Sequence, residues 1–196
     1  MASPSVERKS EMGVDREEAR AEYKNILAGV IRHHQAMERN VTDAAFARIA
    51  RRLGLRVKGG VIDADDEEMA LVSDLALYGR VAGLSRAIDR YAHSASHSLD
   101  AFDRELLEAM RRSWFSILRL TSRHPAAGWY VDDLRLGRTK LWLMNEGIKR
   151  SGQVGLGLGA RVFEFQGFLL LTGGAAPLTP EIMDELDDIQ QAQEEG

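Results

Sequence analysis

The sequence contains no cysteine among its 196 residues. Disulfides, thiolate zinc sites and cysteine nucleophiles are therefore excluded together. Long apolar runs are lacking too: the longest nearly uninterrupted stretch begins with Phe168–Leu171 and is far shorter than the roughly 20 residues that span a bilayer. Residues 1–11 lack the apolar segment of a secretory signal. We therefore expect a cytoplasmic protein with no membrane partner.

Hydrophobic residues make up 44% of the chain and charged residues 29%, a balance typical of a soluble globular protein with a sizeable core. The net charge of -4 conceals an uneven distribution of charge along the chain, because the last sixteen residues hold seven acids and no base. A basic run also precedes the acidic segment 63–68, and its members are Arg32, Arg39, Arg48, Arg51, Arg52, Arg56 and Lys58. Such runs are usually solvated faces, and strong nucleic-acid binding usually needs a larger basic excess.

Apolar residues at helical spacing predict about five helices in the first part of the chain. We expect them over about 15–40, 43–53, 66–78, 84–91 and 100–121. The candidate N-caps of the first three are Asp15, then Thr42 or Asp43, then Asp65 or Asp66. Residues 55–62 change period around Gly59-Gly60 and predict a small hairpin.

Glycine is concentrated in the last third, where ten of the 18 glycines fall between residues 128 and 174. Glycines at this spacing separate short strands, which we expect over 129–136, 140–145, 158–165 and 168–172. Thr179 followed by Pro180 predicts the start of a last helix.

The predicted fold class is α+β: an N-terminal bundle of about five helices, then a small antiparallel β-sheet or partly closed barrel, then a C-terminal acidic helix. The corresponding units are a disordered leader (1–14), a helical domain (15–125), a small β module (126–178) and an acidic helix or tail (179–196).

Short segments follow one another in a particular order and spacing. They are residues 50–55 (ARRLGL), 74–78 (DLALY), 131–134 (VDDL) with Gly137, 160–162 (ARV), and Thr172-Gly173 leading to Pro177. In this arrangement they resemble a family of uncharacterised bacterial proteins over about residues 44–178. The resemblance implies a bacterial source and a helical part joined to a β part. It implies no activity, cofactor or functional residue.

His93 and His97 are four residues apart, the spacing at which two imidazoles share one helix face and can bind zinc. The intervening residues lack the glutamate that a metallohydrolase helix uses as a base, and two ligands do not complete a zinc shell. We expect surface or capping roles for both histidines. A metal-dependent enzyme that uses them with distant carboxylates is kept as an alternative.

Other motifs that could carry chemistry are incomplete. The glycines at 155, 157 and 159 are followed by a strand-like segment and lack a Walker lysine, so they do not form a phosphate loop. The acidic segment 63–68 lacks the glycine and glutamate of an EF-hand loop. No serine stands in a nucleophile elbow. Neither a cofactor nor a catalytic residue is predicted.

The β module carries cationic and aromatic side chains, the combination that grips single-stranded nucleic acid by phosphate contact and base stacking. The candidate binding residues are Lys140, Trp142, Lys149, Arg150 and Arg161. Burial of the tryptophans in the core is the competing and favoured interpretation. We expect a non-catalytic binding or regulatory protein that acts through this module on an unknown protein partner. Weak nucleic-acid binding is an alternative, and a homo-oligomer is left open.

The C-terminal acidic helix carries one thin apolar stripe, formed by Ile182, Leu186 and Ile189. A helix this short is marginal by itself in water, so it must dock or fray. We predict that it masks another surface of this protein or of a partner. The expected surface in this chain is the basic face of Arg48, Arg51 and Arg52, because opposite charges would set its orientation.

Overall fold

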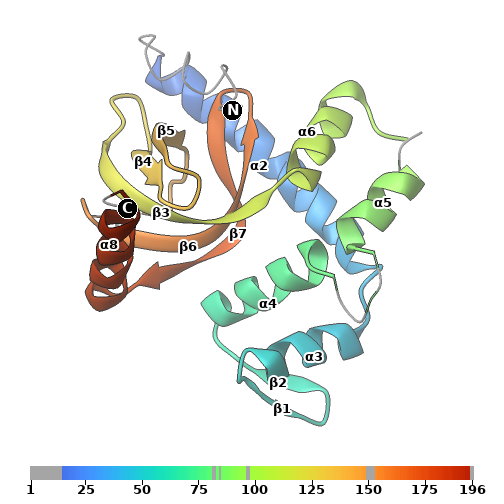
Figure 1. The fold of residues 1–196 in the computed structure, drawn as a ribbon. Helices are drawn as coiled ribbons and strands as arrows, with labels where there is room; N and C mark the ends of the chain where they lie inside the picture. The colour runs from blue at the N-terminus through green and yellow to red at the C-terminus, as the bar shows by residue number, and fades with distance from the viewer. Residues whose placement is uncertain (1–14, 81–82, 84, 96–97, 149–152, 195–196) are drawn as a thin grey trace.

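The computed structural model describes residues 15–80, 83, 85–95, 98–148 and 153–194. The predicted disordered leader, residues 1–14, lies outside this part of the chain. Figure 1 shows a mixed α and β architecture, which confirms the predicted fold class at that level. The helices are α2 (Arg16–Glu38), α3 (Asp43–Arg52), α4 (Asp66–Tyr78), α5 (Ala87–Ala95), α6 (Ala101–Arg111) and α8 (Pro180–Glu194). The strands are β1 (Arg56–Lys58), β2 (Val61–Asp63), β3 (Trp114–Arg123), β4 (Trp129–Asp133), β5 (Arg138–Leu143), β6 (Gly157–Phe165) and β7 (Phe168–Leu178).

The first three helices begin where short polar side chains satisfy their free N–H groups. Asp15 accepts from the amide of Glu17, and Thr42 accepts from that of Ala45. Asp65 and Glu68 form a complete capping box at the start of α4. These caps confirm Asp15, Thr42 and Asp65 from the predicted sets.

The predicted hairpin is also confirmed, as the antiparallel pair β1–β2 between α3 and α4. Gly59 and Gly60 both have positive φ at its turn, a conformation that glycine adopts without steric cost. A small cluster built around Ile49 of α3 and Val72 of α4 joins these elements into one unit.

The predicted fifth helix, 100–121, is wrong in its second half. Helix α6 ends at Arg111, and Trp114–Arg123 is the strand β3. The apolar residues of this segment match a helical period, but they also match a period of two. Ser116, Leu118 and Leu120 are buried in alternation because β3 pairs with a strand on each side, β4 and β6.

Strands β3 to β7 pair in the order β3-β4-β5-β7-β6, and β6 pairs back with β3 to close the ring. The prediction of an antiparallel sheet needs correction at one place, because β5 and β7 run parallel where Leu143 faces Leu169. Strand β7 also continues to Leu178, beyond the predicted end at residue 172.

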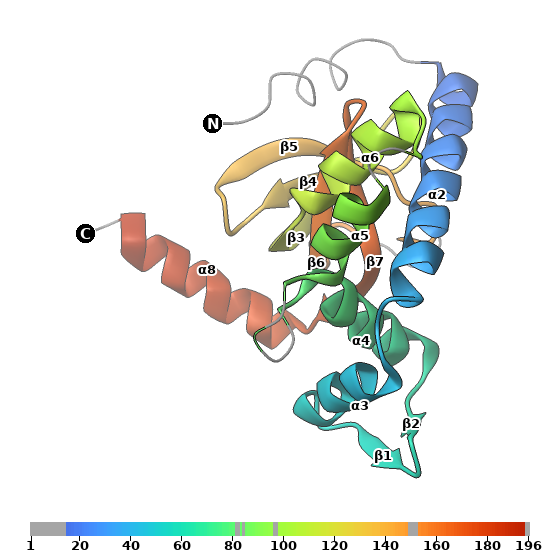
Figure 2. The ribbon, with the colours of Figure 1, turned by 90° about the vertical axis from the view of Figure 1, so that its right-hand side faces the viewer.

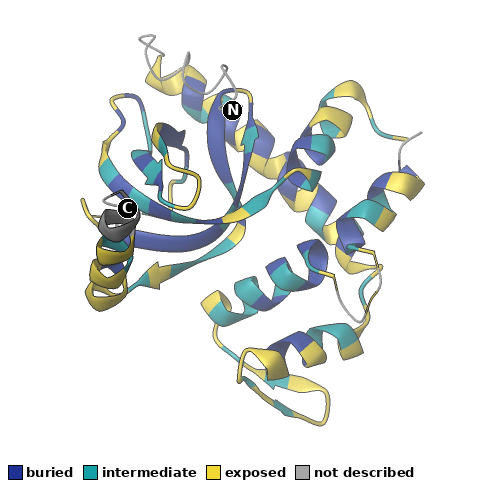
Figure 3. Cartoon of the chain, in the orientation of Figure 1, coloured by how far each residue is buried: buried dark blue, intermediate teal, exposed yellow. Residues whose placement is uncertain are grey.

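The strands of the barrel contribute side chains to two apolar clusters. The interior contains Leu118, Trp129, Val131, Leu141 and Leu169. The second cluster lies between the outside of the barrel and the helices, so residues of α2, α5 and α6 pack against Trp142, Phe163 and Phe168. Figure 3 shows buried residues on these helices and on the strands of the barrel. The helices therefore depend on the barrel for part of their core.

Helix α8 docks on the barrel, which corrects the predicted contact with Arg48, Arg51 and Arg52. Met183 is buried against Gly157 of β6, where a missing side chain makes room for its thioether. Arg119 of β3 forms an ion pair with Asp187. Figure 2 shows α8 on the side of the barrel away from α2. Within the described residues, no helix is long and apolar enough to cross a membrane.

Candidate functional site

The tryptophans of the predicted nucleic-acid surface are buried. Trp142 is 0% exposed and stacks on His124, with 3.7 Å between the ring centroids. Its indole N–H donates to the carbonyl of Ala127 at 2.6 Å. Trp129 is 1% exposed. Neither ring can stack on a base. The favoured interpretation, burial of the tryptophans in the core, is confirmed, and the candidate binding residue Trp142 is a core residue.

The predicted cations of the β module are not gathered around Trp142. Arg161 is committed to an ion pair, with its Nε 3.0 Å from an oxygen of Asp74. Lys140 is exposed on β5, where its backbone N–H donates to the side chain of Asp132. Lys149 and Arg150 lie outside the described residues. The predicted cations therefore do not form, with Trp142, an exposed surface of cations and aromatic rings in the described part of the chain.

The structure describes one member of the predicted histidine pair. His93 is exposed in the last turn of α5, whereas His97 lies outside the described residues. Among the residues that the structure describes, no group of three or more His, Asp or Glu side chains is placed to hold a metal ion.

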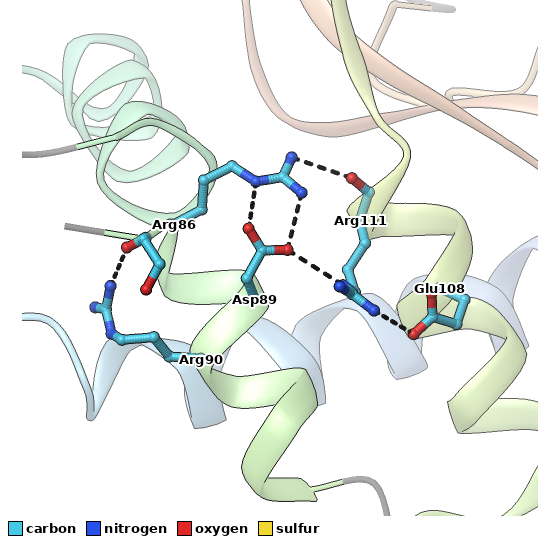
Figure 4. A network of polar contacts seen from close by, with 6 residues as sticks. Arg86, Asp89, Arg90, Glu108 and Arg111 are labelled. Carbon is cyan, nitrogen blue, oxygen red and sulfur yellow. Dashed lines mark hydrogen bonds and ion pairs between the residues drawn. The ribbon is translucent and has the colours of Figure 1, made fainter. Parts of the chain in front are cut away.

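A network of charged side chains joins α5 to α6 (Figure 4). Asp89 accepts two hydrogen bonds from Arg86 and one from Arg111, which also pairs with Glu108. The hydrogen bond from Arg86 is the main reason why the pKa of Asp89 is lowered. Arg86 also donates to the backbone carbonyl of Arg111. Because each charge faces a partner, this cluster is suited to holding two helices together.

A buried carboxylate, Asp133, closes the turn between β4 and β5. It accepts hydrogen bonds from the Trp114 indole at 3.0 Å, from the Ser116 hydroxyl, and from the backbone N–H groups of Arg135 and Leu136. Its oxygens are therefore occupied by donors from two segments, β3 and the turn after β4. Such saturation indicates a structural acid.

A second buried network connects α4 to the barrel. Asp74 is 7% exposed and accepts from the Thr172 hydroxyl at 2.6 Å and from Arg161 at 3.0 Å. The Arg161 guanidinium lies over the Tyr78 ring, 5.5 Å from its centroid. This carboxylate, its cation and the aromatic ring come from α4 and β6, so the network holds the helix against the strands.

Two adjacent histidines of α2 each meet a tyrosine. His33 is buried, with its Nε2 3.0 Å from the carbonyl oxygen of Asp103 and its Nδ1 3.2 Å from the Tyr91 hydroxyl. The carbonyl can only accept, so Nε2 carries the proton and Nδ1 accepts from Tyr91. His33 is therefore a histidine of the core whose two ring nitrogens both have partners.

His34 lies 2.8 Å from the Tyr78 hydroxyl through its Nε2. Burial lowers the pKa of His34 to about 4, and the neighbouring His33 adds to this effect. Burial also raises the pKa of Tyr78 well above its usual value. Both groups are therefore neutral at physiological pH.

A cluster of accessible positive charge lies on α3 and the hairpin. We call this surface the basic arm, and its members are Arg48, Arg51, Arg52, Arg56 and Lys58. All five side chains are exposed, and within the described residues none of them forms an ion pair. Figure 3 shows the exposed residues along α3 and the hairpin. The sequence displayed this basic run, but charge alone did not distinguish an accessible binding face from an ordinary solvated one.

Arg48 of the basic arm lines two hollows. An open groove of about 560 Å³ is lined by Arg48, Arg51, Arg52 and Gly60, among others. A smaller cavity of about 170 Å³ lies toward α5 and is lined by Arg48, Arg90 and the first turn of α3. Leu53 and Val61, beside these cations in the chain, are 43% and 72% exposed. The arm thus offers a concave surface whose open groove is lined by three arginines and one acid, Asp43.

Comparison with known proteins adds a family but no activity. No curated protein and no solved structure matches the chain. A family model matches residues 17–188, which include the basic arm, the barrel and most of α8. The earlier resemblance to an uncharacterised family is confirmed, and the chain belongs to the family of unknown function DUF7986.

Proposed function

We propose that this protein is a non-catalytic binding protein that holds an acidic surface of a partner protein on its basic arm. The observation that carries the proposal is the set of five exposed cations without an ion pair among the described residues. Arginine matches carboxylates with a planar, bidentate donor set, and three of the five cations are arginines on one helix. We expect the setting to be the bacterial cytoplasm.

The spacing on α3 supports one continuous contact. Arg48, Arg51 and Arg52 are related by three and four positions, so they share a helix face about 6 Å long. The opposite side of α3 is anchored by Ile49 and Ala50 on the apolar cluster with α4. A rigid backbone therefore presents the three guanidinium groups together.

The surroundings favour a protein over a nucleic acid. Leu53 and Val61 add apolar area, and arginines beside apolar residues are typical of protein interfaces. The buried indoles leave no stacking platform near these cations.

Charge reversal at two of the arginines tests the proposal. We would measure binding of poly-L-glutamate and of a DNA duplex to the full chain and to Arg51→Glu/Arg52→Glu. A matched control is Arg16→Glu/Arg112→Glu, which changes the net charge equally at two other exposed arginines. We expect the arm variant to lose poly-L-glutamate affinity at least tenfold and the control to lose much less, with affinity falling as salt rises.

Two results would contradict the proposal. An equal loss in both variants would show a response to net charge alone. Tighter binding of the DNA duplex than of poly-L-glutamate, lost in the arm variant, would assign the arm to nucleic acid instead. Melting temperatures of both variants control for folding.

A further inference from the structure

A groove lies between α2 and β7, on elements that do not form the basic arm. It encloses about 230 Å³. Its floor is buried and apolar, with Ile26 at 0%, Met144 at 1% and Leu170 at 3% exposed. Its lips are Leu27 and Ile31, which are 41% and 47% exposed. We call this feature the α2–β7 groove.

One polar group in the α2–β7 groove is His34. The Tyr78 hydroxyl is buried, and in the described part of the chain its one hydrogen-bond partner is His34 Nε2. A buried hydroxyl without an acceptor is costly, so Tyr78 donates and Nε2 accepts. A neutral imidazole carries one proton, which must then be on Nδ1. This N–H has no protein acceptor among the described residues.

A second donor is the side-chain amide of Asn145. Its Oδ1 accepts from the backbone N–H of Ile148 at 3.1 Å, which fixes the orientation of the amide. The NH₂ group of Asn145 has no acceptor among the residues that the structure describes. None of the side chains that line the groove is charged.

We propose that the α2–β7 groove binds a small uncharged molecule with an apolar body and a hydrogen-bond acceptor such as a carbonyl oxygen. The apolar floor and lips match the body, and the donors of His34 and Asn145 match the acceptor. A cavity of about 150 Å³ is enough for benzene, so a substituted ring fits the observed volume. An anion would lose its hydration without meeting a cation in the lining, which disfavours a carboxylate.

The test uses acetophenone as the probe, with ethylbenzene and benzoate as matched compounds. Each is titrated into the ¹⁵N-labelled full chain, and amide shifts are followed by NMR. We expect acetophenone to shift resonances of His34, Asn145 and Leu170–Gly173 and to bind at least threefold more tightly than ethylbenzene or benzoate. Ethylbenzene lacks the acceptor, and benzoate carries the unpaired charge.

Two variants locate the site and test its chemistry. Ile31→Trp places a larger side chain at the lip and should abolish the shifts, whereas Leu136→Trp, at another exposed apolar position, should not. Asn145→Asp keeps the oxygen that accepts from Ile148 but removes the donor. It should weaken acetophenone binding at least threefold and leave ethylbenzene binding unchanged.

The outcomes decide the proposal. Absence of shifts at the groove, or equal shifts in Ile31→Trp and the unmodified chain, would overturn it. If ethylbenzene bound as tightly as acetophenone, the two donors would have no role in binding. If benzoate bound more tightly than acetophenone, the groove would be an anion site. Either result would also overturn the proposal. The poly-L-glutamate assay of the basic arm is independent of all these results.

Discussion

The Thr172 hydroxyl donates a 2.6 Å hydrogen bond to the carboxylate of Asp74, which lies 98 positions earlier in the chain. Thr172 is in β7 and Asp74 is in α4, and both are buried. This bond, together with the Arg161 ion pair, satisfies a charge that would otherwise be costly at the interface of helix and barrel.

Thr172→Val should lower the free energy of unfolding by about 1 to 3 kcal/mol, because it removes a donor from a buried carboxylate and keeps the shape of the side chain. Thr172→Ser keeps the donor and should cost about 1 kcal/mol or less, the value of one methyl group. Urea unfolding of the two variants provides the measurement. Equal stability of Thr172→Val and the unmodified chain would show that Arg161 alone satisfies Asp74.

Stability should rise with pH between about 4 and 6.5. Burial lowers the pKa of His34 and of His124 to about 4, so the unfolded chain binds these two protons at higher pH than the folded chain does. Stability is therefore lost as pH falls from about 6.5 and is lost no further below about 4. Each histidine contributes up to about 3 kcal/mol.

Denaturation midpoints across this pH range check the prediction. His124→Asn and His34→Asn should each make the dependence shallower, because each removes one of the histidines whose pKa is lowered by burial; the pKa of His33 is lowered by burial as well. A slope that is unchanged in both variants would assign the pH dependence to other residues.

Gly174→Ala should destabilise the contact between β7 and α4. A Cβ at Gly174 would lie 2.9 Å from the Cβ of Ala70 and 3.2 Å from the backbone N of Leu71, so the helix would have to move. We expect a loss of about 1 to 3 kcal/mol. Gly173→Ala is the matched control, since its nearest contact is 4.0 Å from the Ala70 carbonyl oxygen. Similar stability of the two variants, measured by thermal unfolding, would contradict this packing.

Met183→Ala should release α8 from the barrel. Met183 is 6% exposed, whereas Ile189 on the same helix is 54% exposed. We expect the first substitution to cost about 2 kcal/mol and to speed proteolysis near residue 180, because a buried anchor is lost. Ile189→Ala should change stability by about 0.5 kcal/mol or less. If both variants resist protease like the unmodified chain, Met183 is not the anchor.

Excess EDTA should leave the melting temperature unchanged. We still expect His93 and His97 to be surface or capping residues, and structural metal binding would contribute directly to the folding free energy. Thermal unfolding of the dialysed protein with and without chelator is the measurement. A large fall on chelation would support the metal-dependent alternative.

Local signals determined several elements of the fold. The capping box of Asp65 and Glu68 and the turn at Gly59-Gly60 act over a few residues, so their outcome could be predicted without the rest of the chain. The strand β3 could not, because the apolar positions of 114–123 suit both a helix and a strand. Pairing with β4 and β6 decided between the two.

Which side chains are accessible for the proposed binding surface likewise depended on the tertiary structure. The sequence by itself determined that Trp142 is aromatic, that residues 48–58 are basic and that the C-terminal helix is acidic. Only the fold decided that Trp142 is buried, that the basic arm is accessible and that α8 docks by Met183 beside Gly157. The physical reason is that exposed charges attract one another only weakly across water and without requiring surfaces of matching shape. Burial, in contrast, requires complementary surfaces, which segments distant in the sequence form together.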